Sequence, residues 1–447
     1  MLANGDYSDI MVSSIIKTPV TVDYLLRKGG DMLLIKNARV VSPEDGLDET
    51  RDVFIENGLF SPPGEPDEIL DGAGLILFPG LVDMHVHFRD PGFTYKEDIL
   101  TGAAAAAAGG VTTAICMPNT RPVIDTPEQV AYVLERARTA SAEVLPFGAV
   151  TAGQRGAELT DHAALKAAGA VALSDDGVPI DSADTMRRGL LSAKKAGMLI
   201  CSHCEYGDMV KNYAVNEGRI SEKLGIPGRP AVAEELMAAR DMMLAKETGA
   251  RVHICHVSTE GTVDLVRRAK AEGVAVTCET CPQYFTATEE LVPEKGALAR
   301  VNPPLRTERD RRAIISGLRD GTIDAIVTDH APHSAEEKAA GLEKAPSGMV
   351  GLETSLALAL TVLWEQEGFS LSDIARLMSA GPAKLLGLDR GTLAIGKKAN
   401  AVLFRTGDFR IDASRFRSKA RNTPFDGMRV AGQVKYTLLG GEIVYRG

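Results

Sequence analysis

The chain has 447 residues, of which 45% are hydrophobic and 25% charged, a balance that excludes disordered, collagen-like and disulfide-stapled proteins. Lys and Arg number 50 and Asp and Glu 60, so the net charge is −10. A chain this acidic is a poor candidate for binding nucleic-acid backbones or anionic membranes, although a local cluster of cations can still hold a small anion.

Cysteine usage and hydropathy indicate where the protein works. Six cysteines do not make a disulfide framework in a chain of this length, and Cys116, Cys201 and Cys255 stand in apolar surroundings typical of reduced, buried thiols. The sequence has no run of 18 apolar residues that predicts a transmembrane helix and no signal-peptide pattern near its start. These features predict a cytoplasmic protein with no membrane or nucleic-acid partner.

The two ends of the chain share one texture. Residues 1–31 are predicted as an N-terminal extension, either a leader ahead of a true start at Met32 or a short structured arm. From residue 32 to 80, short strand-like runs alternate with turn signals such as Asn57-Gly58. Residues 390–447 repeat this pattern, so the two segments are expected to pair into one small composite β-sandwich domain.

Between these ends, residues 81–389 alternate strand-like and helical patterns. Such alternation predicts an α/β fold of parallel strands with right-handed crossovers. Eight units over about 250 residues match a (β/α)8 TIM-type barrel, and an open doubly wound sheet is the alternative. The eight apolar runs are Val82–His87, Val111–Met117, Val144–Val150, Ala170–Ser174, Met198–His203, Arg251–Val257, Val274–Thr280 and Ile323–Asp329.

Histidines gather at the carboxyl ends of those runs. In a barrel these ends form one mouth, where such enzymes carry out their chemistry. Residues i and i+2 of a strand face the same side, so His85 and His87 can share one metal ion, although alone they are as compatible with surface or core histidines. Six of the eight histidines follow this placement: His85, His87, His203, His256, His330 and His333.

Acidic residues at the same predicted rim point to a metal site. Asp175-Asp176 follow the fourth run and Asp329 ends the eighth. Imidazole and carboxylate ligands suit Zn²⁺ and similar ions, and four histidines with two aspartates exceed the usual three ligands of a single catalytic zinc. We therefore predict two ions, bridged by a carboxylate of the Asp175-Asp176 pair with Asp176 as the candidate, and Asp329 placed both to ligate and to shuttle protons.

Six motifs, in family order, resemble those of class I dihydroorotases in the amidohydrolase superfamily. The resemblance covers essentially everything from Met32 onward. The run 83–92 (Asp-Met-His-Val-His-Phe-Arg-Asp-Pro-Gly) resembles the first family motif, and 328–333 (Thr-Asp-His-Ala-Pro-His) followed by Lys338 resembles the second. The others are Met117-Pro118-Asn119-Thr120, Ser174-Asp175-Asp176-Gly177, Cys255-His256-Val257-Ser258-Thr259 and Asn302-Pro303-Pro304-Leu305-Arg306.

The resemblance implies a zinc-dependent cyclic amidohydrolase. Its reaction would be the reversible cyclisation of N-carbamoyl-L-aspartate to L-dihydroorotate plus water in pyrimidine (UMP) biosynthesis, through a hydroxide between two Zn²⁺ ions. Asp329 would act as general acid and base. The implied ligands are His85, His87 and Asp329 for the first ion, His203 and His256 for the second, and Asp176, the second acid of its pair, as the bridge.

Substrate contacts also follow from the resemblance. The small-molecule substrate carries carboxylates, and Arg89 offers a planar fork for the one that does not react. A surface ion pair with Asp90 is the alternative for Arg89, and an Asn-Pro turn is the alternative for Asn302. The implied substrate-binding residues are His87, Arg89, Asn119, Asn302, His333, Ser347 and Gly348.

Other functions stay open at this stage. The run Cys281-Pro282-Gln283-Tyr284 reads more like hydantoinases and allantoinases, which makes a cyclic amide hydrolase of that type the alternative function. A catalytically silent scaffold is the non-enzyme alternative, but such proteins lose metal ligands and this chain has all six candidates. The resemblance also allows for a homo-oligomer and for association with aspartate transcarbamoylase.

Overall fold

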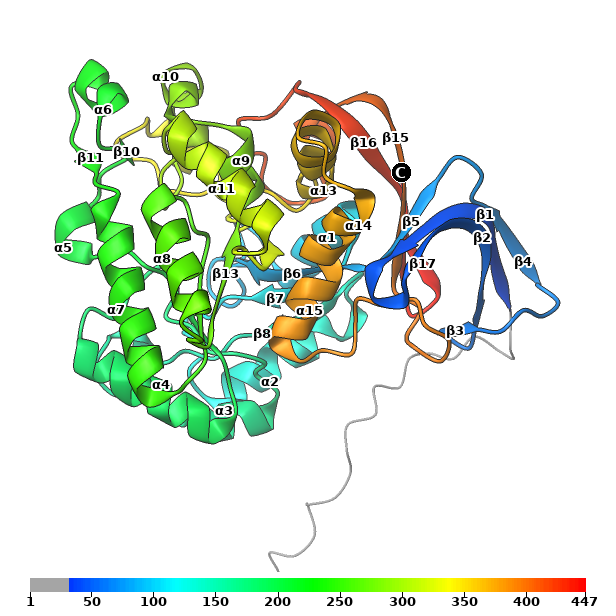
Figure 1. The fold of residues 1–447 in the computed structure, drawn as a ribbon, viewed down its shortest axis with the longest axis horizontal. Coiled ribbons are helices and arrows are strands. Elements are labelled where there is room, and N and C mark those ends of the chain that lie inside the picture. The colour runs from blue at the N-terminus through cyan, green and yellow to red at the C-terminus, as the bar shows by residue number, and fades with distance from the viewer. Residues whose placement is uncertain (1–31) are drawn as a thin grey trace, which may run out of the picture.

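The computed structural model describes residues 32–447 as a small mixed β-sheet beside a larger body of parallel strands and helices (Figure 1). Residues 1–31, predicted as an N-terminal extension, lie outside the described residues. The fold is of the mixed α/β class, as the alternating pattern predicts. Within residues 32–447, no helix is both long and apolar enough to cross a membrane.

The small sheet combines both ends of the described chain. Its main path runs β17-β16-β15-β5-β1-β2-β3, and β4 pairs with β1. Strand β15 joins the two halves, because it pairs antiparallel with β16 on one side and with β5 on the other. The strands are β1 (Leu33–Ser42), β2 (Leu47–Glu56), β3 (Leu59–Ser61), β4 (Glu68–Asp71), β5 (Ile76–Pro79), β15 (Ala401–Arg410), β16 (Arg429–Leu439) and β17 (Glu442–Arg446).

Turn chemistry and apolar alternation explain this sheet. Asn57 and Gly58 connect β2 to β3 with φ of 53° and 77°, the left-handed pair that a tight hairpin requires. The sheet encloses its own core, which includes Ile35, Phe60 and Leu403. The sequence predicted a small β-sandwich here, and hydrogen bonds join the eight strands into one continuous sheet. The two chain ends meet in this sheet through the pairing of β5 with β15.

Two parallel sheets form the centre of the larger body. Their orders are β6-β7-β8 and β14-β13-β12-β9. Single parallel bridges lie between them: Leu173 pairs with Gly148 and with Ile200, and His330 pairs with Val86. The strands are β6 (Leu81–Val86), β7 (Val111–Cys116), β8 (Glu143–Pro146), β9 (Ile200–Ser202), β12 (Val252–Ile254), β13 (Val276–Thr280) and β14 (Ala325–Ile326), with a separate pair β10 (Val215–Asn216) and β11 (Gly228–Arg229).

The fourth predicted strand, Ala170–Ser174, is not a strand in the structure, which is a correction to the sequence analysis. Only Leu173 makes ladder bridges there. The Asp175 carboxylate accepts the backbone N–H groups of Val150 and Thr151 at 2.8 and 3.1 Å, so a side chain satisfies donors that a longer strand would pair. The segment still runs parallel to its neighbours, and Asp176 follows it directly.

Helices follow most of the parallel strands, and side chains cap the first turns of several of them. Thr259, for example, accepts the N–H of Thr262 at 3.1 Å at the start of α8. The helices are α1 (Ile99–Ala108), α2 (Pro127–Arg136), α3 (His162–Ala168), α4 (Ala183–Ala196), α5 (Gly207–Val210), α6 (Arg219–Leu224), α7 (Val232–Thr248), α8 (Glu260–Ala271), α9 (Pro282–Thr286), α10 (Val292–Lys295), α11 (Glu308–Asp320), α12 (Ala335–Ala339), α13 (Ser355–Ala359), α14 (Leu371–Ala375) and α15 (Gly381–Leu386).

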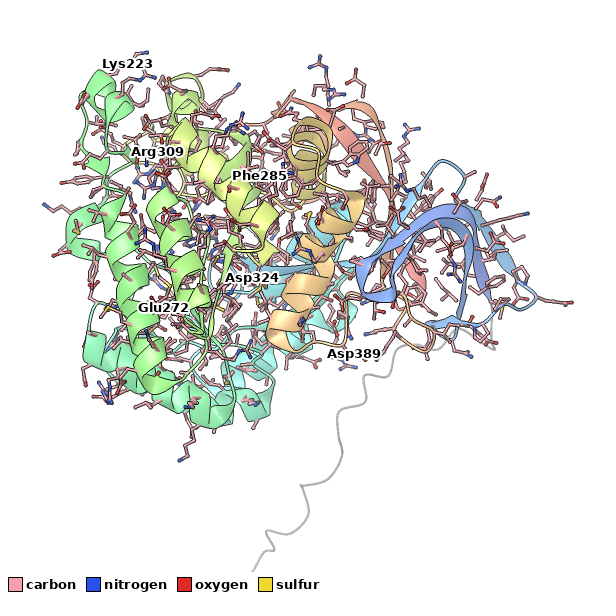
Figure 2. The ribbon with its side chains drawn as sticks, in the orientation of Figure 1. Lys223, Glu272, Phe285, Arg309, Asp324 and Asp389 are labelled. Carbon is pink, nitrogen blue, oxygen red and sulfur yellow. The ribbon has the colours of Figure 1, made fainter. Side chains whose placement is uncertain are left out.

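Polar anchors fix the ends of the short strands. Asp324, labelled in Figure 2, stands just before β14. Its carboxylate accepts the Cys278 N–H at 2.9 Å and lies 2.7 Å from the Lys270 ammonium of α8. All six cysteines are free and buried, as predicted. These anchors hold β13 and β14 in register, so that the residues after them emerge at one end of the sheets.

Candidate metal centre and active site

The six predicted metal ligands come from five different parallel segments and meet at one end of them. Each lies in or just after the carboxyl end of its segment: His85 and His87 at β6, Asp176 after the Leu173 bridges, His203 after β9, His256 after β12 and Asp329 after β14. All six are buried. Residues more than 240 positions apart in sequence are brought within contact distance, as in the 2.9 Å approach of His87 to Asp329.

Asp176 lies at the centre of this cluster. Its Oδ1 is 3.4 Å from His85 Nε2 and 3.3 Å from His203 Nδ1. The same oxygen is 3.6 Å from His256 Nε2, while Oδ2 is 3.5 Å from His87 Nε2. The carboxylate therefore contacts all four histidines, with its two oxygens turned toward different ones. Asp175, by contrast, turns its carboxylate toward the backbone of Val150 and Thr151.

Two groups of ligand atoms flank Asp176. On one side, Asp329 Oδ1 is 2.9 Å from His87 Nε2 and 3.7 Å from His85 Nε2. On the other side, His203 Nδ1 and His256 Nε2 are 2.8 Å apart. His85, His87 and Asp329 each offer one ligand atom, and these atoms lie within 4.8 Å of one another. The arrangement provides two adjacent sets of nitrogen and oxygen donors that share one carboxylate.

The chemistry of these atoms fits a divalent cation. His85 Nε2 and Asp176 Oδ1 are buried and have no hydrogen-bond partner among the described residues. Buried polar atoms without partners are costly, and a cation placed between them would satisfy both. Neutral imidazole nitrogens and carboxylate oxygens are the ligands that Zn²⁺ and similar ions take.

The electrostatics of the cluster lead to the same conclusion. Burial opposes a charged imidazole, but the carboxylates of Asp176 and Glu279 outweigh it and raise the pKa of His85 well above its ordinary value. Burial is likewise outweighed at His203, where hydrogen bonds to Asp176 and Glu205 raise the pKa to about 10. The buried carboxylates thus favour positive charge at the centre of the cluster, which a bound cation can supply.

Glu279, which the sequence analysis missed, orients His85. This glutamate of β13 places Oε1 at 2.6 Å from His85 Nδ1 and Oε2 at 3.2 Å from His253 Nε2. Burial opposes its ionisation, but the charge of His85 outweighs burial and lowers the pKa of Glu279. A carboxylate behind a histidine fixes the tautomer and presents the other ring nitrogen to a metal. An acidic residue inside an apolar strand was the available signal.

Glu205 plays the matching part behind His203. Its Oε2 is 3.3 Å from His203 Nε2 and 2.5 Å from Arg229 Nη1. Burial opposes ionisation, but the His203 hydrogen bond and the Arg229 charge lower the pKa of Glu205 to about 2. His203 is therefore held with Nδ1, not Nε2, toward Asp176. The sequence offered no periodic signal for this pair, because Glu205 lies in an irregular segment and Arg229 in the two-residue strand β11.

A cavity of about 300 Å³ opens above the cluster, and every predicted substrate-binding residue lines it. Arg89 is half-buried there, with Nη2 at 3.5 Å from His333 Nε2. The predicted alternative, an ion pair with Asp90, is not formed, since Asp90 lies 3.7 Å from Arg136 instead. The other predicted residues in the lining are His87, Asn119, Asn302, His333, Ser347 and Gly348.

His333 is held neutral in the wall of this cavity. Its Nε2 donates to the Ser347 carbonyl at 2.9 Å, and its Nδ1 lies 3.3 Å from the Lys96 ammonium. Burial and the nearby charges of Arg89 and Lys96 lower the pKa of His333 to about 2. Lys96 is a further residue that sequence reasoning missed. Arg89 makes this wall cationic, with Lys96 behind His333, whereas the floor of the cavity carries the Asp176 and Asp329 carboxylates.

The two predicted asparagines are placed differently. Asn119 accepts from His87 Nδ1 at 2.9 Å and directs its NH₂ group to Asp176, 3.4 Å from Oδ2. The Asn302 carbonyl oxygen is buried and has no partner among residues 32–447. Asn119 is thus bonded to two cluster residues, while Asn302 keeps an acceptor available at the cavity.

Three of the predicted site residues have positive φ angles without being glycine. The φ angles of Arg89, His256 and Asp329 are 60°, 34° and 48°. This conformation costs about 1–3 kcal/mol at each non-glycine residue and persists only where surrounding contacts impose it. Backbone strain of this kind clusters at functional sites, and here it falls on one cavity-wall cation and two candidate ligands.

Comparisons with known proteins agree with this geometry. A family model described as dihydro-orotase-like matches residues 74–262. Proteins named dihydroorotase from Acetivibrio thermocellus and Ruminiclostridium cellulolyticum are 45% and 46% identical to the chain over 421 residues, covering 93% of it and 99% and 98% of themselves.

Solved structures with a similar fold are cyclic amide hydrolases by name. The L-hydantoinase (dihydropyrimidinase) from Arthrobacter aurescens superposes with a TM-score of 0.83 at 28% identity, over 93% of this chain and 96% of that one. The dihydropyrimidinase from Brevibacillus agri gives 0.81 at 25% identity, over 94% and 95%. Fold and relatives therefore define an enzyme of the cyclic amidohydrolase class. Within that class the chain belongs to the dihydroorotase family, which confirms the resemblance found in its motifs.

Proposed function

We propose that this protein interconverts N-carbamoyl-L-aspartate and L-dihydroorotate plus water, a step of de novo pyrimidine biosynthesis. The observation that carries the proposal is the pairing, in one cavity, of a carboxylate–histidine floor with a cationic wall built around Arg89. The floor suits activation of water and an amide carbonyl, and the wall suits a substrate carboxylate. Relatives named dihydroorotase along 93% of the chain support this substrate.

We also infer that the parallel segments close into a (β/α)8 barrel. The bridges at Leu173 link β8 to β9, and the Val86–His330 bridge with the His87 N–H bond to His330 O at 2.9 Å links the other two edges. These pairings connect β6, β7, β8, the Leu173 segment, β9, β12, β13 and β14 in a ring. The corresponding domains are residues 81–389 for the barrel and 32–80 with 390–447 for the small β domain.

The cluster is proposed to hold two Zn²⁺ ions. One set of ligands is His85, His87 and Asp329, the other is His203 and His256, and Asp176 serves both, which agrees with its contacts to all four histidines. Bound zinc would supply a hydroxide nucleophile near neutral pH and polarise the amide carbonyl. Glu279 and Glu205 would fix which ring nitrogens of His85 and His203 face the ions.

Asp329 is proposed as the general acid and base. It lines the cavity beside His87. Burial opposes its ionisation, but the His87 hydrogen bond and the charge of His85 lower the pKa of Asp329, so the carboxylate is available as a base. In ring opening it would accept a proton from the attacking water and return it to the departing ring nitrogen; in cyclisation it would do the reverse.

Arg89 is proposed to bind the substrate carboxylate that does not react. A guanidinium presents two parallel N–H groups to such a carboxylate, and the buried Arg89 Nε has no partner among the described residues. His333, whose Nε2 donates to the Ser347 carbonyl, would pack beside the bound carboxylate next to Arg89, and Asn302 would accept from an amide edge of the ring. Asn119, bonded to His87 and Asp176, would contact the substrate from the side of the cavity that faces the cluster.

A hydantoinase- or allantoinase-type amide hydrolase is the second candidate, favoured by the fold of the solved structures. Assaying N-carbamoyl-L-aspartate, L-dihydroorotate, hydantoin and allantoin side by side separates the two. We expect turnover of the first pair, because only those molecules offer a free carboxylate to Arg89. Turnover restricted to hydantoin or allantoin contradicts the proposal.

Assembly follows from the family resemblance. We propose that the chain forms a homo-oligomer and associates with aspartate transcarbamoylase. Light scattering of the purified chain, alone and mixed with the aspartate transcarbamoylase of the same organism, tests both. A monomer unchanged by mixing contradicts both.

A further inference from the structure

Asn422, in the connection between β15 and β16, contacts the substrate side of the cavity from outside the predicted barrel. It is buried, and its side-chain oxygen accepts the His333 N–H at 3.2 Å. Its NH₂ group donates to the carbonyls of Ala331 and Gly348, both at 3.1 Å. The side-chain amide of Asn422 thus bonds to two loops, one with His333 and the other with Gly348, and both carry proposed substrate contacts.

These two loops form a short parallel ladder, and Asn422 extends it. His330 and Met349 are bridge partners, and the Ala331 N–H donates to the Met349 carbonyl at 2.8 Å. The Asn422 side-chain amide accepts the N–H of residue 333 and donates to the carbonyl of residue 331. In a parallel pair of strands, one peptide residue bonds to residues i and i+2 of its neighbour in the same way. The side chain replaces a peptide group, while its own carbonyl accepts the Val350 N–H at 3.0 Å.

The spacing between the loops decides whether His333 fits. Gly348 has φ of 135°, and a Cβ there would lie 3.1 Å from His333 Nε2 and 2.7 Å from Ala331 Cβ. The His333 ring therefore packs directly on the Gly348 backbone, with its N–H on the Ser347 carbonyl. If the two loops moved slightly apart, the hydrogen bond from His333 to Ser347 would break and the His333 ring would move away from Arg89. The Asn422 side chain opposes this movement because it is bonded to both loops.

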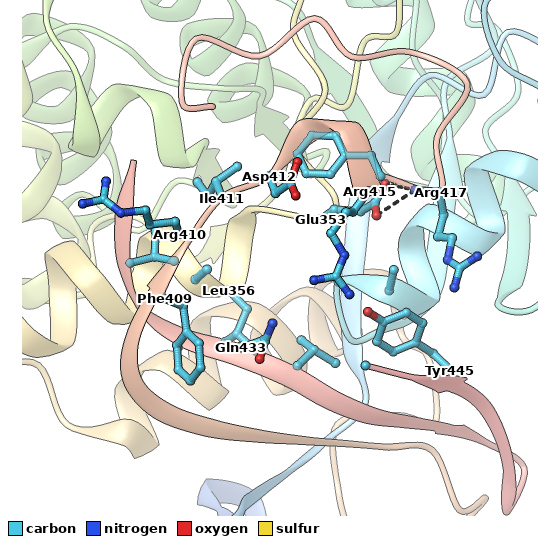
Figure 3. A pocket seen from close by; sticks show the side chains of 18 of the residues that line it. Glu353, Leu356, Phe409, Arg410, Ile411, Asp412, Arg415, Arg417, Gln433 and Tyr445 are labelled. Atoms are coloured by element: carbon cyan, nitrogen blue, oxygen red, sulfur yellow. Dashed lines mark hydrogen bonds between the residues drawn. The ribbon is translucent and has the colours of Figure 1, made fainter. Parts of the chain in front are cut away.

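The segment that carries Asn422 is itself firmly held. The Glu353 carboxylate accepts the backbone N–H groups of Arg417, at 2.8 Å, and Ser418, at 3.0 Å, as Figure 3 shows for Arg417. The buried Glu97 accepts the Ser418 hydroxyl and the Lys419 N–H. Two carboxylates thus fix the chain three to five residues before Asn422, so the asparagine reaches the loops from a firmly held segment.

We propose that Asn422 is a positioning residue, which sets the distance between the loops bearing His333 and Gly348 and thereby the affinity for the substrate carboxylate. The proposal rests on the proposed function of this cavity. Asn422 does not itself line the cavity and reaches it only through its hydrogen bonds to His333, Ala331 and Gly348, so we expect it to act on binding and not on the chemical step.

The first test is steady-state kinetics of Asn422→Ala with L-dihydroorotate. We expect KM to rise about tenfold or more, because three hydrogen bonds to two loops are lost, with kcat changed less than about threefold and metal content unchanged. Asn422→Ser, which puts a single hydroxyl in place of the amide, should give an intermediate KM. The matched control is Asn400→Ala, which removes another buried asparagine, bonded to Gly440 N–H at 2.9 Å in the small sheet, and should leave KM unchanged.

The second test is hydrogen–deuterium exchange and needs no activity. Peptides covering 331–335 and 346–351 should exchange faster in Asn422→Ala than in wild type, while peptides over β7 and β8 stay unchanged. If wild type does not turn over L-dihydroorotate, the proposed function fails and exchange alone judges Asn422. An unchanged KM with unchanged exchange overturns the proposal, and so does loss of folding in both Asn422 variants, since a residue that only spaces two loops leaves the rest folded.

Discussion

The floor and the wall of the cavity are built by different means. The floor consists of His85, Asp176 and their neighbours, which stand at the ends of parallel segments and contact one another directly. The wall consists of Arg89, His333 and the Ser347-Gly348 turn, which lie on loops. Groups on paired strands are placed by the backbone hydrogen bonds of the strands, whereas loop residues need separate supports.

Those supports come from residues outside the cavity. Lys338 donates to the carbonyls of Ala297 and Pro346, both at 2.9 Å, and Arg300 donates to the Ser347 hydroxyl at 3.1 Å. With Asn422, they fix the loop that ends the wall. Substitutions in the floor should therefore abolish metal binding and turnover. Substitutions in the wall should weaken substrate binding and leave the chemical step largely intact.

The largest effect is expected from Asp176→Asn, compared with its neighbour Asp175→Asn. Asp176 contacts four histidines, so its loss should release metal and lower kcat about a thousandfold or more. The Asp175 variant should keep metal and most turnover, because that carboxylate bonds to backbone N–H groups instead. Elemental analysis and kinetics check both variants. Equal losses of metal and turnover in the two variants would contradict the assignment of Asp176, and not Asp175, to the metal cluster.

The next effect separates binding of metal from proton transfer. Asp329→Asn keeps an oxygen at the same place but cannot accept a proton, so we expect metal content to stay near wild type while kcat falls about 10²–10⁴-fold. Circular dichroism and metal analysis establish that the variant is folded and loaded. Wild-type rates in such a sample contradict the assigned role.

A smaller effect is expected at the wall. Arg89→Lys keeps the charge and removes the planar fork, which should raise KM for L-dihydroorotate about 10–100-fold with a smaller change in kcat. Arg136→Lys is the matched control, because Arg136 lies 3.7 Å from Asp90, the residue next to Arg89, and is half exposed. A fall in kcat alone would place Arg89 in the chemical step instead.

The smallest expected effect is on the pH dependence of the free energy of unfolding, through Lys338, which supports the wall. Burial and the charge of Arg300 lower the pKa of Lys338 to about 7. An unfolded lysine keeps a pKa of about 10.4, so between about pH 7 and pH 10 the unfolded chain binds more protons, and the stability contributed by this group rises with pH. Below pH 7 both states are protonated and the penalty for burying the charge is complete.

The measurement is the free energy of unfolding of wild type minus that of Lys338→Met at pH 7, 8 and 9. We expect this difference to move in favour of wild type by up to about 1.4 kcal/mol per pH unit. Lys384→Met, at an exposed position of α15, gives the baseline for loss of a lysine. A difference that is constant with pH, or that falls as pH rises, contradicts the lowered pKa.

Sequence patterns were informative where a residue's place follows from its own segment. The spacing of His85 and His87 and the position of Asp329 after an apolar run predicted a shared rim, and the structure brings these residues together. Glu279, Glu205 and Lys96 could not be found this way, because their roles depend on partners such as His203 and His333 that lie in other segments. The Leu173 segment was mispredicted as a strand because the Asp175 carboxylate takes up neighbouring backbone donors.

The amino-acid sequence by itself determined the α/β alternation, the pairing of the two chain ends and the set of histidines and aspartates that gather at one rim. It could do so because apolar period, turn chemistry and position at a strand end are local properties. Only the tertiary structure decided which ring nitrogen each histidine presents, which carboxylate stands at the centre and which distant asparagine spaces the substrate loops. Those outcomes depend on distances across segments, which no local pattern encodes.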